Sequence, residues 1–257
     1  MPAPDLIIPG SPCWVELCTS DPDASAEFYR QVFGWDIVDP GAEFGGYRNF
    51  VIDSGPVAGF FPNSSETCSI DAWSVYLSAL DAAATVDAAL RRGADVIVPV
   101  MAIHDLGVMA CITDSANAII GIWEPGSHRG CSTIGAPGTP RWFELWTWDF
   151  PSAVDFYRSV FGCDVEVSSG AAEPRCATLG VGGAARASVV DATSFTPPDV
   201  PACWRVSFGT DDADATAVQC ERLGGAIVAP ARNTHRGRQV SVSDVTGAVF
   251  DLLGPIS

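Results

Sequence analysis

Hydrophobic and polar positions follow the same order in both halves of this chain. In the first half, an apolar run at 13–19 alternates in the manner of a strand. Asp21 and Pro22 then suit the cap and the first residue of a helix, whose apolar stripe ends at Gly34. Runs rich in Val, Ile, Phe and Tyr, bounded by Gly, Pro or Asp, predict short strands near 35–38, 47–52 and 57–61.

A second unit of the same kind begins at Trp73. Its pattern predicts a strand at 73–79 and a helix at 82–92 that Gly93 closes. Further strands are predicted near 95–98, 108–113 and 119–123. The first half is therefore predicted to contain two βαβββ modules, which is an α+β arrangement.

The second half of the chain repeats the first. The segment WVELCTSDPDASAEFYRQVFGWDI begins at Trp14, and WFELWTWDFPSAVDFYRSVFGCDV begins at Trp142, with 12 of 24 positions identical. Between the halves lies GSHRGCSTIGAPGT, which has the Gly, Ser, Thr and Pro content of a linker. We predict domains at 9–125 and 140–255, joined by a linker at 126–139, with four βαβββ modules in total.

The charge balance limits the partners. The chain has 31 Asp and Glu residues against 14 Arg and no Lys, and its formal net charge is −17 at pH 7. Nucleic acids and anionic membrane surfaces attract clustered Lys and Arg, so we expect neither as a partner. No apolar run approaches the ~20 residues that span a bilayer. The first ten residues do not predict a secretion signal, so a cytoplasmic location is expected.

The absence of lysine also excludes two reaction classes. Schiff-base catalysis needs a lysine amine, and a P-loop needs a lysine at the phosphates. The nine cysteines are an odd number with no C-x-x-C pair and no Cys/His cluster at zinc spacing. The sequence therefore predicts neither a disulfide framework nor a structural zinc site.

Two motifs carry a resemblance to a known family. The pattern FYxxVFG follows a capping Asp in both halves, at 21–35 and 149–163, and a D-x-x-G turn opens the last strand at 244–253, with a weaker copy at 114–123. In these features the chain resembles the vicinal oxygen chelate superfamily, which includes glyoxalase I, extradiol dioxygenases and bleomycin resistance proteins. The resemblance implies two tandem glyoxalase-like domains, each with an open sheet around a cavity, and commonly a divalent metal on the cavity floor.

The ligand positions of metal-binding relatives fall mostly on unsuitable residues in this chain. An indole has no lone pair for a metal, and of the side chains at these positions only that of Asp251 is an acidic ligand. We therefore expect no metal and no other cofactor, although His104, His235 and Asp251 leave an unconventional metal site open. The positions concerned are Trp14, Ser74 and Gly121 in the first half and Trp142, Arg205 and Asp251 in the second.

Glu16 and Glu144 are the first candidates for catalysis. Each follows the repeated Trp by two positions, so strand alternation places both side chains on the same face as that Trp. A carboxyl in an aromatic pocket has a raised pKa and can serve as a general acid or base. The alternative is a structural carboxylate paired with Arg inside the sheet.

Three further polar residues complete the candidate chemistry. His104 and His235 occupy equivalent loops before a late strand, so His235 is a candidate acid or base and His104 a candidate ligand contact, or both are ordinary loop residues. Arg205 would stabilise negative charge on a substrate, or would pair with Asp251 or Glu144. His128 lies in the linker and is expected to be solvated.

Tryptophan indicates a pocket for a flat apolar molecule. Rigid aromatic rings commonly line small-molecule pockets. The aromatic candidates for ligand binding are Trp14, Trp73, Trp142, Trp146 and Trp204, and the polar candidates are His104 and Asp251. The alternative is that some of them pack between the two halves.

These observations favour a metal-independent enzyme that performs acid/base chemistry on a hydrophobic, aromatic polycyclic small molecule in secondary metabolism, such as antibiotic biosynthesis. Two alternatives stay open. One is a protein of the bleomycin-resistance type that sequesters such a molecule, and the other is a metal-dependent glyoxalase or dioxygenase. Fusion of two halves provides four modules in one chain, so a monomer is expected, and a dimer is the alternative.

Overall fold

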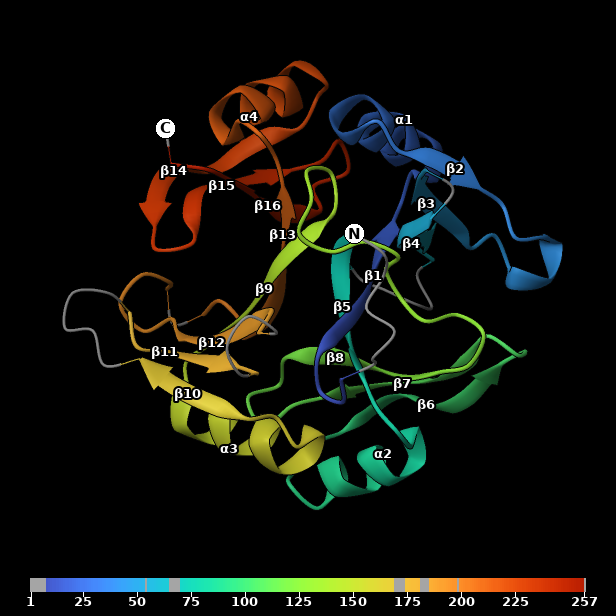
Figure 1. Ribbon diagram of the computed structural model, residues 1–257, viewed down its shortest axis with the longest axis vertical. Coiled ribbons are helices and arrows are strands. Elements are labelled where there is room, and N and C mark those ends of the chain that lie inside the picture. Colours follow the sequence, from blue (N-terminus) through green and yellow to red (C-terminus); the bar gives the residue numbers. More distant parts are fainter. Residues whose placement is uncertain are drawn as a thin grey trace.

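The protein folds into two eight-stranded mixed sheets, one from each half of the chain (Figure 1). The computed structural model describes residues 8–53, 55–64, 70–168, 174–180, 185–197 and 199–256. The α+β class and the tandem arrangement of glyoxalase-like βαβββ modules agree with the sequence-based prediction. Within the described part of the chain, no helix is long and apolar enough to cross a membrane.

The first half contains two modules in direct succession. The first module consists of β1 (Pro12–Thr19), α1 (Pro22–Phe33), β2 (Asp36–Val38), a short 3₁₀ turn (Ala42–Phe44), β3 (Arg48–Ile52) and β4 (Gly55–Pro62). The second consists of β5 (Ala72–Ser78), α2 (Ala82–Leu90), β6 (Val96–Ile103), β7 (Gly107–Thr113) and β8 (Ile119–Pro125).

The second half repeats this order. Its first module consists of β9 (Pro140–Thr147), α3 (Phe150–Phe161), β10 (Val165–Ser168), β11 (Cys176–Leu179) and β12 (Ala187–Asp191). Its second module consists of β13 (Cys203–Gly209), α4 (Ala213–Arg222), β14 (Ala226–Thr234), β15 (Gly237–Ser243) and β16 (Val249–Gly254).

The helix boundaries follow from local chemistry. At the start of α1 the Asp21 side chain accepts a hydrogen bond of 3.0 Å from the backbone N–H of Ala24, with Pro22 in the first turn. At its end Gly34 adopts φ 71°, a left-handed conformation that glycine tolerates without strain. The sequence predicts both ends of this helix correctly.

The first strands of the modules form the centre of each sheet. In the first sheet the order is β2-β3-β4-β1-β5-β8-β7-β6, and the second sheet has the same order with the equivalent strands. β1 pairs antiparallel with β5, which sets Trp14 opposite Tyr76 and Glu16 opposite Ser74. Side chains that leave these two strands on one face therefore converge in the middle of the sheet.

The other face of each sheet meets the opposite half of the chain. α1 packs against α4, and α2 packs against α3, so the first module lies beside the fourth and the second beside the third (Figure 1). One continuous apolar core runs through both halves and includes Trp35, Phe50, Trp73, Phe208 and Phe250. Burial on this scale is the main stabilising contribution to the joined halves.

Candidate functional site

Each sheet lines a cavity on the side that carries the repeated Trp and Glu. The cavity of the first half has a volume of about 690 Å³ and is lined largely by aromatic and aliphatic side chains. The equivalent cavity of the second half has a volume of about 140 Å³. Because ligand pockets of several hundred Å³ suit small molecules of drug-like size, only the first cavity has room for a molecule with several fused rings.

Glu16 lies in the wall of the larger cavity. Alternation along β1 directs Trp14 and Glu16 to the cavity and buries Val15 and Leu17 in the core. Burial in these apolar surroundings raises the pKa of Glu16 to about 7, although hydrogen bonds from two phenols oppose the rise. At neutral pH this carboxyl is therefore close to half-protonated, the condition that suits a general acid or base.

The two phenols belong to Tyr76 and Tyr47. Tyr76 donates a short hydrogen bond to Oε1 of Glu16, and Tyr47 also bonds to that carboxylate. Tyr47 in turn accepts a hydrogen bond of 2.9 Å from the indole Nε1 of Trp14. Burial, followed by the neighbouring carboxylate of Glu16, raises the pKa of both phenols well above the usual value, so both remain protonated donors at neutral pH.

Glycine makes room for each tyrosine. A Cβ at Gly121 would overlap the ring of Tyr76, and a Cβ at Gly59 would overlap the hydroxyl of Tyr47. Gly121 pairs with Tyr76 across β5 and β8, and Gly59 pairs with Glu16 across β1 and β4. The two missing side chains therefore allow the phenols to lie over the sheet next to Glu16.

Histidine enters the first cavity from two loops. His104 lies in the turn between β6 and β7, with its ring 5.1 Å from that of Phe44. His128, which the sequence led us to expect in solvent, instead lines the cavity with its ring edge-on to Trp14 at 4.5 Å. Burial lowers the pKa of His128 to about 4, so its imidazole is neutral at pH 7. That expectation was wrong because the linker packs back onto β1, where the N–H of Cys131 bonds to the carbonyl of Cys13.

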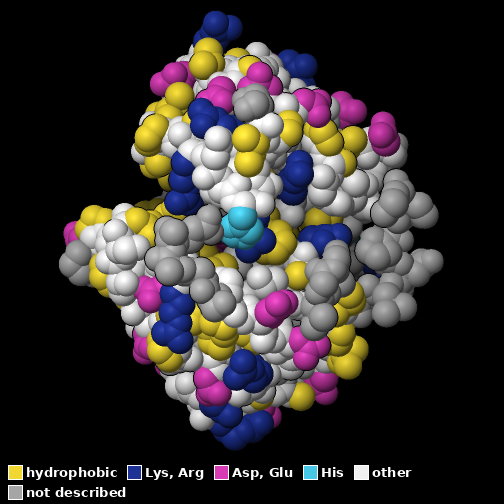
Figure 2. Space-filling view, turned by 60° about the vertical axis from the view of Figure 1, so that its left-hand side comes forward, with side chains coloured by type: hydrophobic (Ala, Val, Ile, Leu, Met, Phe, Trp, Pro, Cys, Tyr) yellow, Lys and Arg dark blue, Asp and Glu magenta, His cyan; other side chains and the backbone are white. Residues whose placement is uncertain are grey.

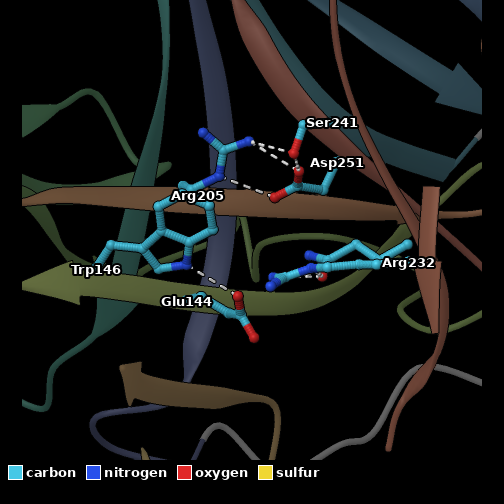
Figure 3. A network of polar contacts seen from close by, with 7 residues as sticks. Glu144, Trp146, Arg205, Arg232, Ser241 and Asp251 are labelled. Carbon is cyan, nitrogen blue, oxygen red and sulfur yellow. Dashed lines mark hydrogen bonds and ion pairs between the residues drawn. The ribbon is translucent and has the colours of Figure 1, made fainter. Parts of the chain in front are cut away.

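The predicted catalytic arginine of the second half is held inside an ion pair. Arg205 donates to both carboxylate oxygens of Asp251 at 2.9 and 2.8 Å, and its guanidinium lies 4.4 Å from the centre of the Trp146 ring (Figure 3). The Asp251 side chain is 1% exposed. Of the alternatives that the sequence left open for Arg205, the structure contains the pairing with Asp251.

Glu144 and His235 do line the second cavity, together with Trp142. Glu144 accepts a hydrogen bond of 3.0 Å from the indole of Trp146 (Figure 3). Arg236 extends over Trp142 and Arg232 lines the same cavity, so these long side chains take up space that is open in the first half. Trp146 and Asp251, which the sequence led us to expect at a ligand, are not among the residues that line it, and neither is Arg205, which both of them contact.

The metal-ligand positions of the family do not form a donor set in either half. In the first half these positions are occupied by Trp14, Ser74 and Gly121. The indole of Trp14 donates its N–H to Tyr47, and Gly121 has no side chain. In the second half the guanidinium of Arg205 already engages the one carboxylate. Across the described residues no group of three His, Cys, Asp or Glu side chains could hold a metal ion. His104, His235 and Asp251, the members of the unconventional site, lie in two different halves and are not brought together.

Trp73 and Trp204 do not lie in either cavity. Both are 7% exposed and belong to the core, where Trp73 donates to Tyr29 and Trp204 donates to Tyr157. The assignment of these two residues to ligand binding is therefore corrected. Each precedes by one position the residue on the cavity side of its strand, so alternation turns the indole toward the opposite half.

Sequence reasoning missed the two tyrosines that hold Glu16. Tyr76 follows Ser74 by two positions, and alternation from Ser74 would have directed it to the cavity. For Tyr47 no signal exists in the sequence, because the partner glycine on β4 is known only once the strands are paired. In the second half the position of Tyr76 is held by Ser207, so repetition could not reveal it.

Comparison with known proteins supports the same scaffold. A family model described as "bleomycin resistance protein-like N-terminal" matches residues 13–47. A putative glyoxylase, CFP32, from Mycobacterium tuberculosis is 34% identical over 96% of this chain and 95% of its own length. The anthracycline biosynthesis protein DnrV of Streptomyces peucetius is 32% identical over 95% of this chain and 93% of its own length.

Solved structures resemble the chain in fold at low sequence identity. A Mn(II)-bound glyoxalase from Novosphingobium aromaticivorans superposes with a TM-score of 0.66 at 16% identity, covering 98% of this chain and 84% of the other. The 2,3-dioxygenase LapB from Pseudomonas sp. KL28 superposes with a TM-score of 0.63 at 12% identity, covering 96% and 92%. Likeness at this identity concerns the fold alone.

Proposed function

This chain belongs to the vicinal oxygen chelate superfamily, and on that premise we propose that it is an enzyme of secondary metabolism that transfers protons on a hydrophobic, polycyclic aromatic small molecule without a metal. The observation that carries the proposal is the position of Glu16. Its carboxyl lies in the wall of a cavity of about 690 Å³, with a pKa of about 7 and two phenols bonded to it.

Glu16 is the proposed base and acid. As a carboxylate it takes a proton from a carbon or a hydroxyl next to a carbonyl group of the bound substrate, and as a carboxylic acid it returns a proton elsewhere on the same molecule. A protonated carboxyl is a weaker acceptor, so the arrival of the proton frees Tyr76 or Tyr47 to donate to the oxygen on which negative charge develops. The two steps are thus coupled through one set of hydrogen bonds.

The substrate class rests on the shape and lining of the cavity and on the relatives. Trp14 and Trp123 supply flat apolar surfaces, and Met101 and Met109 supply flexible ones that adapt to an irregular outline. DnrV and its relative DauV from another Streptomyces strain are named for anthracycline biosynthesis, and anthracyclines are flat polycyclic aromatic compounds. A ketone or a hydroxyquinone fused to aromatic rings fits this lining and offers an acidic proton on the carbon or the hydroxyl next to its carbonyl.

Metal independence is part of the proposal and is supported by the residues at the ligand positions. In the first half neither Trp14 nor Gly121 offers a lone pair to a cation. The phenols of Tyr47 and Tyr76 supply the polarisation of a substrate oxygen that the metal supplies in other members of the family.

The test is solvent proton exchange into 2-tetralone, a bicyclic aromatic ketone with acidic C–H bonds beside its carbonyl. In D₂O we expect the protein to accelerate deuterium uptake at this position above the rate in buffer, as measured by mass spectrometry. Glu16→Gln should abolish the acceleration, and the matched change Glu144→Gln in the second half should leave it intact. Acceleration that survives Glu16→Gln would overturn the proposed role of Glu16.

A second candidate is sequestration of the same class of molecule without turnover. It is favoured by the match of residues 13–47 to the bleomycin resistance protein-like model and by the apolar lining of the cavity. Binding of 1,8-dihydroxyanthraquinone, followed by tryptophan fluorescence, separates the two functions. Tight binding with no proton exchange in wild type would favour the sequestering protein, whereas binding retained in Glu16→Gln with exchange lost would favour the enzyme.

A further inference from the structure

The smaller cavity of the second half differs in chemistry from the larger one. Arg232, from the end of β14, and Arg236, from the β14–β15 turn, both line it, and Glu144 is the acidic side chain among its described lining residues. We propose that this cavity is a separate binding site for a small aromatic carboxylate, whose anionic group lies between Arg232 and Arg236 at the mouth and whose ring lies against Trp142. This site does not depend on the function proposed for the first half.

Arg232 is held ready for an anion. Its Nε and one terminal nitrogen donate to Oε1 of Gln239 at 3.2 and 3.0 Å. Gln239 is 5% exposed, so the guanidinium has a fixed support. Gln239 is neutral, and within the described part of the chain Arg232 forms no ion pair and its other terminal nitrogen has no acceptor. A planar guanidinium with one edge held in this way presents the remaining donors to a carboxylate.

Arg236 provides the second cationic wall. Its guanidinium carbon lies 3.6 Å from the centre of the Trp142 ring, close enough for a cation–π contact that fixes the orientation of both side chains. The indole of Trp142 is also held at its edge, where Nε1 donates a hydrogen bond of 3.1 Å to the hydroxyl of Ser188. Glu144, the acidic side chain of the described lining, is bonded to the indole of Trp146. Arg232, whose described partner is the neutral amide of Gln239, is therefore the cation that an anionic ligand would meet.

The size and the apolar walls limit the body of the ligand to one ring. A cavity of roughly 150 Å³ in a protein interior holds benzene, and this one has about 140 Å³. Trp142, Phe195, Val190 and Leu253 supply its apolar walls. Arg232 is exposed, so an anion at the mouth keeps part of its hydration and pays little desolvation. Figure 2 looks onto a face of the molecule where arginine side chains gather around a histidine near a hollow.

The cavity of the first half lacks the corresponding site for an anion. Gln239 is equivalent to Met109, and Leu253 is equivalent to Trp123, by the spacing of the repeat. Neither Lys nor Arg lines the first cavity among the residues that the structure describes there. The duplicated halves have therefore diverged into one large apolar cavity and one small cationic cavity.

The experiment is calorimetric titration of the full chain with benzoate at low ionic strength. We expect saturable binding that weakens at least tenfold in Arg232→Ala and in Arg232→Gln, the second variant being the milder change if the first unfolds. Arg222→Ala removes the same charge from an exposed position on α4 and should bind benzoate like wild type. Glu16→Gln should also bind like wild type, which keeps this test apart from that of the proposed function.

Two further probes separate the anionic group from the ring. Benzyl alcohol lacks the charge and inorganic phosphate lacks the ring, so each should bind at least tenfold more weakly than benzoate. Absence of benzoate binding, equal binding by Arg232→Ala, or equal weakening by Arg222→Ala overturns the site. Benzyl alcohol that binds as tightly as benzoate overturns the role of the arginines, and phosphate that does so overturns the apolar half of the proposal.

Discussion

Tyr157 of the second half donates a hydrogen bond of 2.9 Å to Oδ2 of Asp114 in the first half. The duplicated residues make the same contact in the opposite direction, because Tyr29 donates to Oδ2 of Asp244 at 3.2 Å. Both tyrosines belong to the FYxxVFG motif, and both aspartates open the turn before the last strand of a half. The motifs that carry the family resemblance thus meet each other across the two halves.

Removal of one of these phenol hydroxyls should destabilise the packing of the two halves against each other. Tyr157→Phe leaves the buried carboxylate of Asp114 with one donor fewer and the indole of Trp204 without its acceptor. We expect a loss of about 1–3 kcal/mol in the free energy of unfolding, measured in urea. Thr193→Val, which removes a hydroxyl from an exposed turn instead, serves as the control for losing a hydroxyl. A loss in Tyr157→Phe that is no larger than in this control would contradict a structural role for the contact.

The ionised carboxyl of Glu16 should lower the free energy of unfolding at alkaline pH. Its pKa is raised in the folded protein to about 7 from a usual value of 4.5, so between these values the folded state binds more protons than the unfolded state. Stability therefore falls as pH rises through this range. Glu16→Gln should raise the free energy of unfolding at pH 8 by about 1–3 kcal/mol and change it little at pH 4. A stabilisation that is independent of pH would contradict the raised pKa.

The rate of proton exchange should depend on the ionised fraction of Glu16. Exchange of 2-tetralone needs the charged form of Glu16 as base, so its rate should rise with pH and reach half of its plateau near pH 7. The control is the uncatalysed rate in buffer at each pH. A midpoint near the usual carboxyl value would contradict a base with the raised pKa of Glu16.

Gly121 should tolerate no side chain while Tyr76 is present. Gly121→Ala places a methyl group in the space of the Tyr76 ring, and overpacking of this kind costs about 1–3 kcal/mol. The displaced phenol would leave Glu16 with a weaker set of donors, so the pKa of Glu16 should rise further, as followed by carboxyl NMR. In the background Tyr76→Ala, Gly121→Ala should change the free energy of unfolding little. An equal loss in both backgrounds would contradict the overlap with the Tyr76 ring as its cause.

His128 should remain neutral through the physiological range. Burial against Trp14 and Trp123 lowers the pKa of its imidazole to about 4, and protonation destabilises the fold as pH falls below the usual histidine value. NMR titration of the imidazole, assigned by comparison with His128→Asn, should give a midpoint near 4. A midpoint near 6.5 would place the ring in solvent and not in the cavity.

Arg205 should prove structural. Arg205→Ala leaves the carboxylate of Asp251 buried and unpaired, which typically costs about 3–5 kcal/mol. Arg205→Met combined with Asp251→Leu removes both charges and should recover most of that stability, by urea unfolding. Proton exchange of 2-tetralone should be unchanged in the double variant, and loss of exchange there would restore a catalytic part for Arg205.

The sequence by itself determines the scaffold of this protein. Period-two and helical patterns, the caps at Asp21 and Gly34, and the internal repeat predict tandem βαβββ modules, because these features depend on neighbours in the chain. Alternation after the repeated Trp also directs Glu16 and Glu144 to one face of each sheet, and the structure has both side chains in cavity walls. The spacing of the repeat likewise directs His104 and His235 to equivalent cavities.

Only the tertiary structure decides how the two halves differ. Strand pairing sets Tyr76 over Gly121, and the folding back of the linker adds His128 to the cavity. The packing of the two halves buries Trp73 and Trp204 in the shared core, and the tertiary fold brings Arg205 into an ion pair with Asp251. Each of these contacts joins residues that are distant along the chain, and the volume left in a cavity depends on all of them together. A local pattern therefore places a side chain on a face, whereas packing decides what surrounds it and how strongly its pKa shifts.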